Sequence, residues 1–187
     1  MKIAQGKHRF VVAFPRLGIA IKIAKIKPIE ALKRFWNVFI RHKGNAKEKL
    51  TRLKFELFKM VPRAMPTIGY HLFYGIYNNW REFIFYQKTK NLFLQPTWFS
   101  FIGLFNIQPY GRPTDRSLGD LRHGLYDLTD GQVSLDGHHF DEPSNFTVEN
   151  NRLKILDYGH QTTQKIITAY GQKIWEEFDP SQCPKYK

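Results

Sequence analysis

The sequence predicts an α+β fold that is divided into two small lobes. Three observations support this prediction. The N-terminal segment is rich in β-branched and aromatic residues, several later segments repeat apolar residues at helical spacing, and basic residues are concentrated in the first part of the chain. The chain has 187 residues, which is enough to bury one sizeable core, so we expect a single compact domain over residues 1–187.

Composition excludes several classes of protein. Hydrophobic residues make up 42% of the chain and aromatic residues 16%, which argues against intrinsic disorder. The single cysteine, Cys183, cannot form an internal disulfide and favours a reducing compartment. Charged residues interrupt each N-terminal apolar stretch, and no apolar run approaches the length of about 18 residues that a transmembrane helix needs. We therefore expect a cytoplasmic protein without a transmembrane segment, produced in its own cell or inside a host cell.

Charge divides the chain into a basic and an acidic part. Residues 1–114 contain 21 of the 29 Lys and Arg residues but only four acidic residues, whereas residues 115–187 contain 8 basic and 12 acidic residues. We expect the basic part to form an N-lobe over residues 1–111 and the acidic part to form a reduced C-lobe over residues 112–187. A basic lobe is suited to an anionic partner such as a nucleotide, a nucleic acid or an acidic membrane surface.

The first two predicted elements form a β-hairpin. Residues 8–14 and 19–26 have the composition of strands, and residues 15–18 between them have the composition of a turn. Side chains alternate between the two faces of a strand, so one face of the second strand carries isoleucines and the other carries alanines and a lysine: Ile19, Ile21 and Ile23 against Ala20, Lys22 and Ala24. We therefore predict one apolar face and one face with small side chains around Lys22.

A pair of basic helices follows the hairpin. Apolar residues recur at helical spacing in residues 28–43 and again in residues 46–60, with a break at residues 44–45. Residues 25–63 contain 12 Lys and Arg residues and three Glu residues. We predict that residues 28–63 form a helical insertion in the N-lobe. Its basic surface either binds an acidic partner or is the solvated face of helices that cover the core.

The remaining predicted elements are helices and short strands. The pattern predicts helices at residues 78–94, 116–127 and 161–178 and strands at residues 98–102, 104–108 and 152–156. The last of these strands is apolar and leads directly into Asp157. An aspartate in this position is a candidate for a functional site, although aspartate before glycine is also common in ordinary turns.

Two motifs in the C-lobe resemble the catalytic segment of the protein-kinase superfamily. Residues 139–145 read His-Phe-Asp-Glu-Pro-Ser-Asn, and the strand after them ends in Asp157-Tyr158-Gly159. They resemble the H-x-D…N catalytic loop and the D-F-G metal motif of protein kinases. The resemblance implies that Asp141 is the catalytic base and that Asn145 and Asp157 hold Mg²⁺. This chain has three residues between Asp141 and Asn145, where the family has four.

The N-lobe contains a further segment that resembles the family. Residues 19–22 read Ile-Ala-Ile-Lys and resemble the V-A-I-K strand of kinases. This resemblance implies that Ala20 lies against the adenine of ATP and that Lys22 binds the phosphates. Residues 105–111 would then be the hinge between the lobes, with Gln108 among the nucleotide-binding residues. Taken by itself, Lys22 also fits a solvated lysine on a hairpin.

The resemblance also implies that a helix glutamate pairs with Lys22. Glu82 is the only acidic residue between residues 57 and 114, and its predicted helix ends before two strands, as in the family. Glu48 and Glu56 on the basic helices are the alternatives. We therefore predict that Lys22 and Glu82 belong to the catalytic set and that ATP and Mg²⁺ are the cofactors.

Three departures from the family leave two classes of function open. No G-x-G-x-x-G sequence precedes the strand of Lys22, about 50 residues separate Lys22 from the helix of Glu82, and 28 residues follow Gly159. The first hypothesis is an ATP- and magnesium-dependent phosphotransferase whose acceptor is an unknown protein or small molecule. The second is a pseudokinase or binding module whose basic helices engage a protein, a nucleic acid or an acidic membrane surface.

The histidines give only weak indications of a metal or catalytic site. His138, His139 and His160 lie near acidic residues, but their spacing and that of Cys183 match no zinc site, so we expect polar loop residues. Ser144 and His139 could be paired as nucleophile and base, but no G-x-S-x-G sequence supports that assignment.

Overall fold

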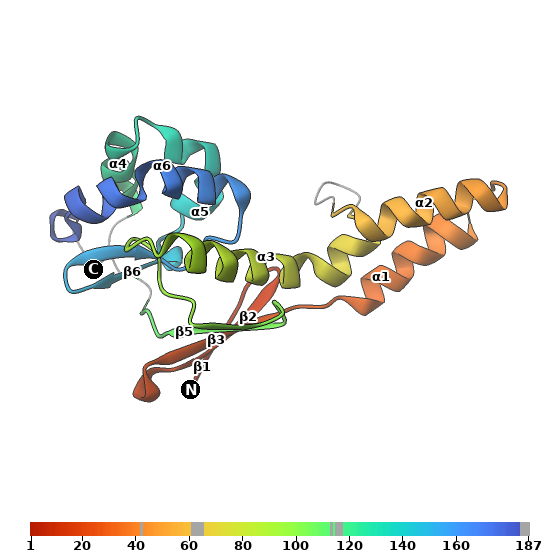
Figure 1. Ribbon diagram of the computed structural model, residues 1–187, viewed down its shortest axis with the longest axis horizontal. Coiled ribbons are helices and arrows are strands. Elements are labelled where there is room, and N and C mark those ends of the chain that lie inside the picture. The colour runs from red at the N-terminus through yellow and green to blue at the C-terminus, as the bar shows by residue number, and fades with distance from the viewer. Residues whose placement is uncertain (42, 61–65, 113, 115–117, 184–187) are drawn as a thin grey trace.

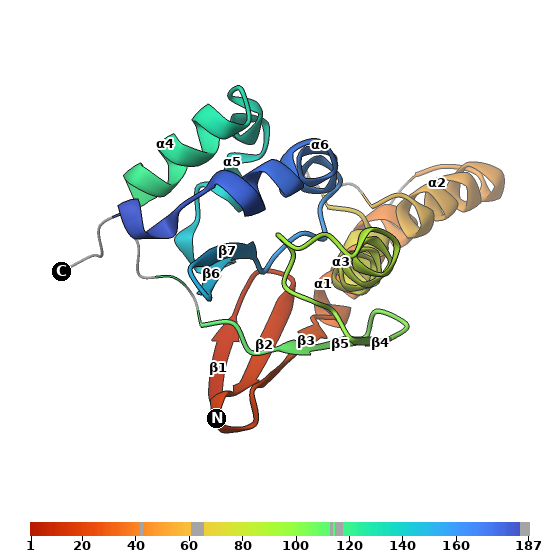
Figure 2. The same cartoon turned by 60° about the vertical axis from the view of Figure 1, so that its left-hand side comes forward.

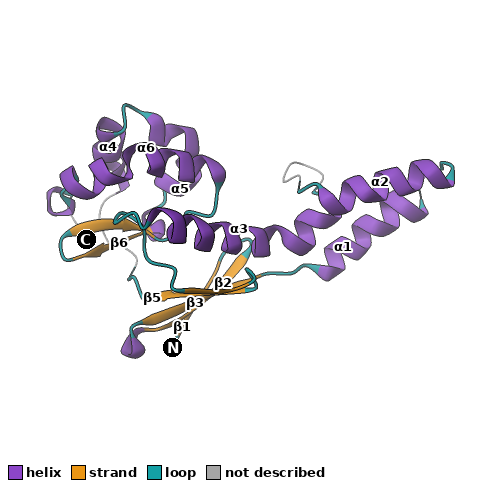
Figure 3. Cartoon of the chain, in the orientation of Figure 1, coloured by secondary structure: helices purple, strands orange, loops and turns teal. Residues whose placement is uncertain are grey.

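The computed structural model of the protein describes residues 1–41, 43–60, 66–112, 114 and 118–183. The architecture is α+β, as the sequence predicts (Figure 3). A five-stranded sheet lies beneath the long helix α3 (Ile68–Thr89). A helical lobe that includes a two-stranded hairpin lies at one end of α3, and two helices extend as an arm at the other end (Figure 1).

The N-terminal sheet has the strand order β1-β2-β3-β5-β4, and every neighbouring pair is antiparallel. Its strands are β1 (Lys2–Gln5), β2 (Arg9–Phe14), β3 (Ile19–Ala24), β4 (Phe99–Phe101) and β5 (Phe105–Pro109). The predicted hairpin is formed by β2 and β3 around the turn η1 (Pro15–Leu17), and Gly18 closes it with a φ of 65°, which glycine adopts without strain. The sequence did not predict β1, because this exposed edge strand contains a single β-branched residue.

The two basic helices pack side by side in an arm that points away from the sheet (Figure 1). Helix α1 (Pro28–Phe35) continues as the π-helical turn η2 (Trp36–Ile40), and α2 (Ala46–Phe58) returns beside it. Asn45 and Glu48 form a capping box at the start of α2, in which Asn45 Oδ1 accepts a hydrogen bond from the Glu48 N–H at 2.9 Å. Arg34 and Glu56 join the two helices by an ion pair. The predicted insertion is therefore helical, and its residues 61–63 lie outside the described residues.

Helix α3 begins ten residues earlier than the sequence predicted. Thr67 caps it, because its Oγ1 accepts a hydrogen bond from the Tyr70 N–H at 3.3 Å. The first turns contain Gly69 and Gly75, and glycine is a poor helix former, which hides the helical pattern. Both glycines allow close packing of backbones. A Cβ on Gly75 would lie 2.6 Å from the His8 carbonyl oxygen on the sheet side, and one on Gly69 would lie 2.2 Å from the carbonyl oxygen of a residue in α2.

The C-terminal lobe is built around the hairpin of β6 (Phe146–Glu149) and β7 (Arg152–Ile155), over which α4 (Leu118–Leu128) and α6 (Gln161–Glu177) pack (Figure 2). The turn residues Asn150 and Asn151 both have positive φ, which suits a tight hairpin turn. The short helical segments of the lobe are η3 (Gln132–Asp136), α5 (Gly137–Phe140), η4 (Pro143–Asn145) and η5 (Pro180–Gln182). Strand β7 matches the predicted strand, whereas β6 was not predicted.

The main apolar core lies in this lobe. It is formed by fully or almost fully buried side chains, including Phe93, Phe140, Phe146, Ile155, Tyr158 and Ile167. Phe93 lies just after α3, so the core joins the end of that helix to the hairpin and to α6. None of the helices in the described part of the chain has both the length and the apolar composition that a membrane span requires.

The close approach at Gly75 leads to a prediction about stability. A methyl group there would meet two backbone atoms, His8 O at 2.6 Å and Lys25 N at 3.2 Å, which cannot move without shifting the sheet. Overpacking costs about 1–3 kcal/mol, and the higher helix propensity of alanine returns about 1 kcal/mol. We expect Gly75→Ala to lower the free energy of unfolding by up to about 2 kcal/mol in a urea titration.

A second buried helix glycine provides the matched control. The atom nearest to a Cβ on Gly171 in α6 is the amide end of the Asn91 side chain, at 2.8 Å, and that group can rotate away. Gly171→Ala should therefore be tolerated better than Gly75→Ala. Equal stability of the two variants would contradict the packing that we describe for α3.

Candidate functional site

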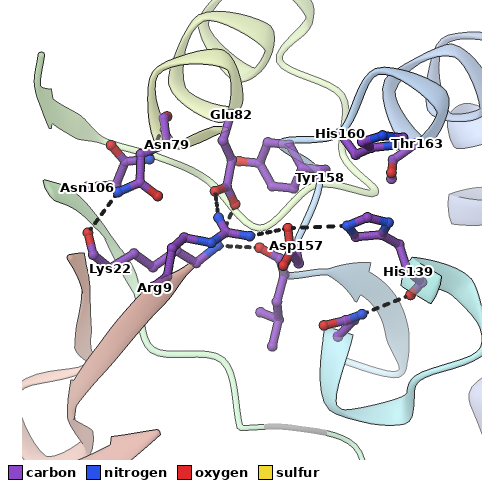
Figure 4. A network of polar contacts seen from close by, with 12 residues as sticks. Arg9, Lys22, Asn79, Glu82, Asn106, His139, Asp157, Tyr158, His160 and Thr163 are labelled. Atoms are coloured by element: carbon purple, nitrogen blue, oxygen red, sulfur yellow. Dashed lines mark hydrogen bonds and ion pairs between the residues drawn. The ribbon is translucent and has the colours of Figure 1, made fainter. Parts of the chain in front are cut away.

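Four charged side chains meet where the sheet, α3 and the segment after β7 approach one another. Lys22 comes from β3, Glu82 from α3, Asp157 from the segment after β7, and Arg9 from the start of β2 (Figure 4). The Lys22 ammonium forms an ion pair with Glu82 and donates a hydrogen bond to the Leu156 carbonyl oxygen. Lys22 and Glu82 are both buried. Of the three glutamates considered from the sequence, Glu82 is therefore the partner of Lys22, whereas Glu56 pairs with Arg34 and Glu48 caps α2.

Arg9 completes this charge cluster, and no sequence pattern predicted it there. One nitrogen of its guanidinium lies 2.6 Å from Glu82 Oε2, and another forms an ion pair with Asp157 Oδ1. The turn between β1 and β2 positions this arginine, because the Gly6 N–H donates to the Arg9 carbonyl oxygen at 2.9 Å. Two cations thus face two anions. The charges balance within a site that is largely shielded from water, as the burial of charged groups requires.

Burial and neighbouring charges shift the pKa values in this cluster. Burial lowers the pKa of Lys22, and the negative charge of Glu82 opposes this shift. Burial alone would raise the pKa of Asp157, but the positive charges of Arg9 and Lys22 outweigh it and hold that pKa well below its ordinary value. Asp157 is therefore an anion at neutral pH. It can act as a ligand for a metal ion without first losing a proton.

A cavity of about 480 Å³ lies on one side of the cluster. Its lining includes most of the residues that the resemblance predicted for nucleotide and metal binding: Ala20, Lys22, Gln108, Asn145 and Asp157. Ala20 and Gln108 lie directly opposite each other in the pairing of β3 with β5. Gln108 Oε1 is buried and has no hydrogen-bond partner among the described residues, so it is available to a polar ligand.

Asn145 lies at the wall of this cavity, whereas Asp141 does not. The Asn145 side-chain amide donates to the His139 carbonyl oxygen at 3.1 Å, and the backbone carbonyl oxygen of Asn145 accepts from the Leu156 N–H at 2.6 Å. These bonds hold it beside the segment that carries Asp157. Asp141 ends α5, lines neither of the two cavities described here, and has Arg122 Nε at 3.3 Å from its Oδ1. The structure therefore brings the predicted site residues together with the exception of Asp141, whose role as a base stays a prediction.

A second cavity, of about 460 Å³, lies on the other side of Arg9. Both cavities share Gly6, Arg9, Asn145 and Asp157 in their linings. The second cavity also contains three side chains whose ligand atoms all lie within 4.8 Å of one another: Asp136, His139 and His160. A carboxylate and two imidazoles are suitable ligands for a transition-metal ion such as Zn²⁺.

Asp136 organises this histidine pair. Its Oδ1 lies 2.8 Å from His139 Nδ1, its Oδ2 lies 3.8 Å from His160 Nδ1, and Thr163 donates a hydrogen bond to it. From the sequence we expected His139 and His160 to be polar loop residues, and Asp136 was not among the predicted site residues. The contact between Asp136 and His139 could have been predicted from the sequence, because residues three apart face each other across a helical turn. The position of His160 depends on how α6 packs, which no local pattern reveals.

Comparison of the chain with protein-family models, with curated proteins and with solved structures gave no match. An assignment of function therefore rests on the geometry and chemistry of the site. The resemblance to protein kinases, which rests on short motifs, stays a prediction.

His139 gives a prediction about the dependence of stability on pH. Burial would lower the pKa of His139, but the hydrogen bond to Asp136 and the charge of Asp157 raise it above the ordinary value. Because this pKa is higher in the folded protein than the value of about 6.5 in the unfolded chain, protonated His139 stabilises the fold. The contribution is fully present below about pH 6.5 and is lost as the pH rises through the folded-state value.

The measurement is a set of urea titrations between about pH 5 and pH 9, with a chelator present. We expect His139→Gln to lower stability more at the acidic end of this range than at the alkaline end. His138→Gln, which removes the exposed neighbouring imidazole, is the control and should lack this trend. A loss of stability in His139→Gln that does not change with pH would contradict the ion pairing.

Proposed function

We propose that this chain is an ATP- and magnesium-dependent phosphotransferase with a two-lobed, kinase-like arrangement and an acceptor that is a protein or a small molecule. One observation carries the proposal. The buried ion pair of Lys22 and Glu82 lies beside Asp157 at the wall of a cavity that Ala20 and Gln108 also line. The kinase resemblance implies that these residues surround ATP, although they are far apart in the sequence.

The residues present fit ATP and Mg²⁺ chemically. The ammonium of Lys22 is suited to the phosphates of a nucleotide, and its partner Glu82 holds it in place. Asp157 and the amide oxygen of Asn145 are hard oxygen ligands of the kind that Mg²⁺ prefers. The unpartnered Oε1 of Gln108 is an acceptor for the amino group of adenine. Bound Mg²⁺ would neutralise the phosphate charge during transfer.

The second cavity is the proposed space for the phosphate acceptor. It meets the nucleotide cavity at Arg9, Asn145 and Asp157, so an acceptor there would face the terminal phosphate across a shared wall. His139 lines this second cavity and is held by Asp136. If Asp141 does not reach the acceptor, His139 is the alternative general base.

Arg9 favours a second candidate function, a pseudokinase. Its guanidinium already supplies the positive charge next to Asp157 that Mg²⁺ would supply. A pseudokinase that binds ATP through Arg9 and Lys22 would need no metal. In the phosphotransferase, Arg9 has to release Asp157 and contact the phosphates instead, which would compensate for the missing glycine-rich loop.

Magnesium-dependent ATP binding is the first consequence to test. If the Kd is about 0.1 mM, ATP at about 1 mM stabilises the fold by roughly 1.4 kcal/mol. For a chain of this size, that corresponds to an increase in Tm of about 3–6 °C in a thermal-shift measurement. We expect Lys22→Met and Asp157→Asn to abolish most of this increase, because they remove a phosphate ligand and a metal ligand.

Matched controls separate site chemistry from general charge effects. Lys165→Met in α6 and Asp127→Asn in α4 remove the same charges at exposed positions and should leave the Tm increase unchanged. An equal increase with and without Mg²⁺ would favour the pseudokinase. No increase under either condition, or the same increase in Asp157→Asn as in the original chain, would refute the proposed nucleotide site.

Phosphate transfer tests the assignment of the base. General-base catalysis contributes about 10²–10⁴-fold, so whichever of Asp141→Asn and His139→Gln removes the base should lose transfer by at least about 100-fold. The assay uses labelled ATP and reads autophosphorylation together with transfer to generic protein and small-molecule acceptors. Transfer that survives in Asp141→Asn but is lost in His139→Gln would show that His139 is the base. Nucleotide binding without transfer in the original chain would favour the pseudokinase.

A further inference from the structure

The outer face of the N-terminal sheet is apolar, and side chains there remain exposed. Residues that pair directly across neighbouring strands point to the same face, and one such row runs across four strands: Phe10, Ile23, Phe105 and Phe101. Phe101 is 48% exposed, and Phe10 and Ile23 are also exposed. In Figure 1, α3 lies above the sheet and no described element lies below it. We call this surface the apolar sheet face.

A second row extends the same face. It contains Val12, Ile21, Ile107 and Phe99, which are paired in register across β2, β3, β5 and β4. Phe99 is exposed and the other three are half-buried. The opposite, inner face carries the buried polar side chains Lys22, Ser100, Asn106 and Gln108. An ordinary sheet packs its apolar face inward, whereas this sheet has its polar face inward and its apolar face outward. Among the described residues, the apolar sheet face therefore has no element packed on it.

The arm carries a second exposed apolar surface. Four large side chains on α1 and η2 recur every three or four residues and lie on one side of the helix: Ile29, Leu32, Trp36 and Ile40. All four are exposed, Leu32 at 67% and Trp36 at 53%. We call this set the α1 stripe. In Figures 1 and 3 the sheet and α1 form the lower side of the molecule, beneath α2 and α3.

The arm is also rich in basic residues. Residues 25–63 contain 12 Lys and Arg residues against three Glu residues, and Glu56 is already neutralised by Arg34. Exposed lysines lie on both helices of the arm, for example Lys33 on α1 and Lys54 on α2. The combination of an apolar helix face that includes tryptophan with surrounding lysines and arginines is typical of helices that lie in a membrane interface.

We propose that the apolar sheet face and the α1 stripe together bind the surface of an anionic lipid bilayer. Their aromatic and aliphatic side chains enter the interface, and the basic residues of the arm interact with the lipid headgroups. Nucleic acid would satisfy the positive charge but would leave the apolar side chains uncovered. A second copy of the chain would cover the apolar side chains but would bring two basic arms together. An anionic bilayer would cover the apolar side chains and also neutralise the positive charge. Membrane binding does not depend on the proposed catalytic function.

The test is sedimentation of the full chain with vesicles. One set of vesicles contains phosphatidylcholine and phosphatidylserine, and the other contains phosphatidylcholine alone. We expect binding to the anionic vesicles that weakens as salt is raised, and much weaker binding to the neutral vesicles. Trp36→Ser and Phe101→Ser should each reduce the partition coefficient about tenfold, because each removes a large apolar side chain from the interface. Lys33→Glu combined with Lys54→Glu should reduce binding to anionic vesicles only.

Matched variants on the other lobe serve as controls. Leu135→Ser removes an apolar side chain that is 68% exposed, and Lys165→Glu reverses an exposed charge on α6. Neither should change vesicle binding. All substituted positions are exposed, so circular dichroism and thermal melting should show that the variants fold as the original chain does.

Three outcomes would overturn the proposal. The first is no sedimentation with either kind of vesicle. The second is vesicle binding that Trp36→Ser and Phe101→Ser leave unchanged, which would make the contact purely electrostatic. The third is a stable dimer in analytical ultracentrifugation that Phe101→Ser dissociates and that does not bind vesicles, which would assign the apolar sheet face to a second copy of the chain.

Discussion

The buried cluster of Lys22, Glu82, Arg9 and Asp157 is the interaction on which the rest of this structure depends. It joins β2, β3, α3 and the segment after β7, so it connects the sheet to both the long helix and the C-terminal lobe. Removing Glu82 would leave the buried Lys22 without its ion pair, and removing Arg9 would take from Asp157 its closest cation. Loss of the partner of a buried charge costs far more than loss of an exposed ion pair. Two of its members, Arg9 and Asp157, line both cavities.

This cluster explains the unusual character of the sheet. Its inner face carries buried polar side chains that donate hydrogen bonds to nearby backbone carbonyl oxygens. Asn79 on α3 donates to the Gly103 carbonyl oxygen at 3.1 Å, and Asn106 on β5 donates to the Asn79 carbonyl oxygen at 2.8 Å. Apolar side chains are consequently placed on the outer face, where α3 cannot cover them. The main apolar core lies instead in the C-terminal lobe, so the sheet depends more on its charges than on a core of its own.

The site combines features of an enzyme with features of a binding protein. The Lys22 and Glu82 ion pair, the anionic Asp157 and the unpartnered Gln108 Oε1 are arranged around one cavity in a way that suits a nucleotide. Arg9 and the position of Asp141 leave open how a phosphate would be transferred. Asp136, His139 and His160 form a second group of potential metal ligands, which lies in the adjoining cavity. The two cavities share Arg9, Asn145 and Asp157, so under the proposed function the nucleotide and the acceptor would meet there.

The sequence by itself determined the elements whose signals are local. The alternation of side chains predicted the hairpin of β2 and β3 and the face on which Lys22 lies. Apolar residues at helical spacing predicted the basic arm and α6. The resemblance to kinase motifs pointed to Asn145 and Asp157, and to Glu82 as the partner of Lys22. Tertiary structure alone decided the rest, because those features depend on contacts between distant segments. The early start of α3 follows from backbone packing at Gly75, and β1 and β6 exist through pairing with stronger neighbours. The contacts of Arg9 with the site and of His160 with Asp136 join segments that are far apart in the sequence. No local repeat of residue types could reveal them, so they depend on how those segments pack.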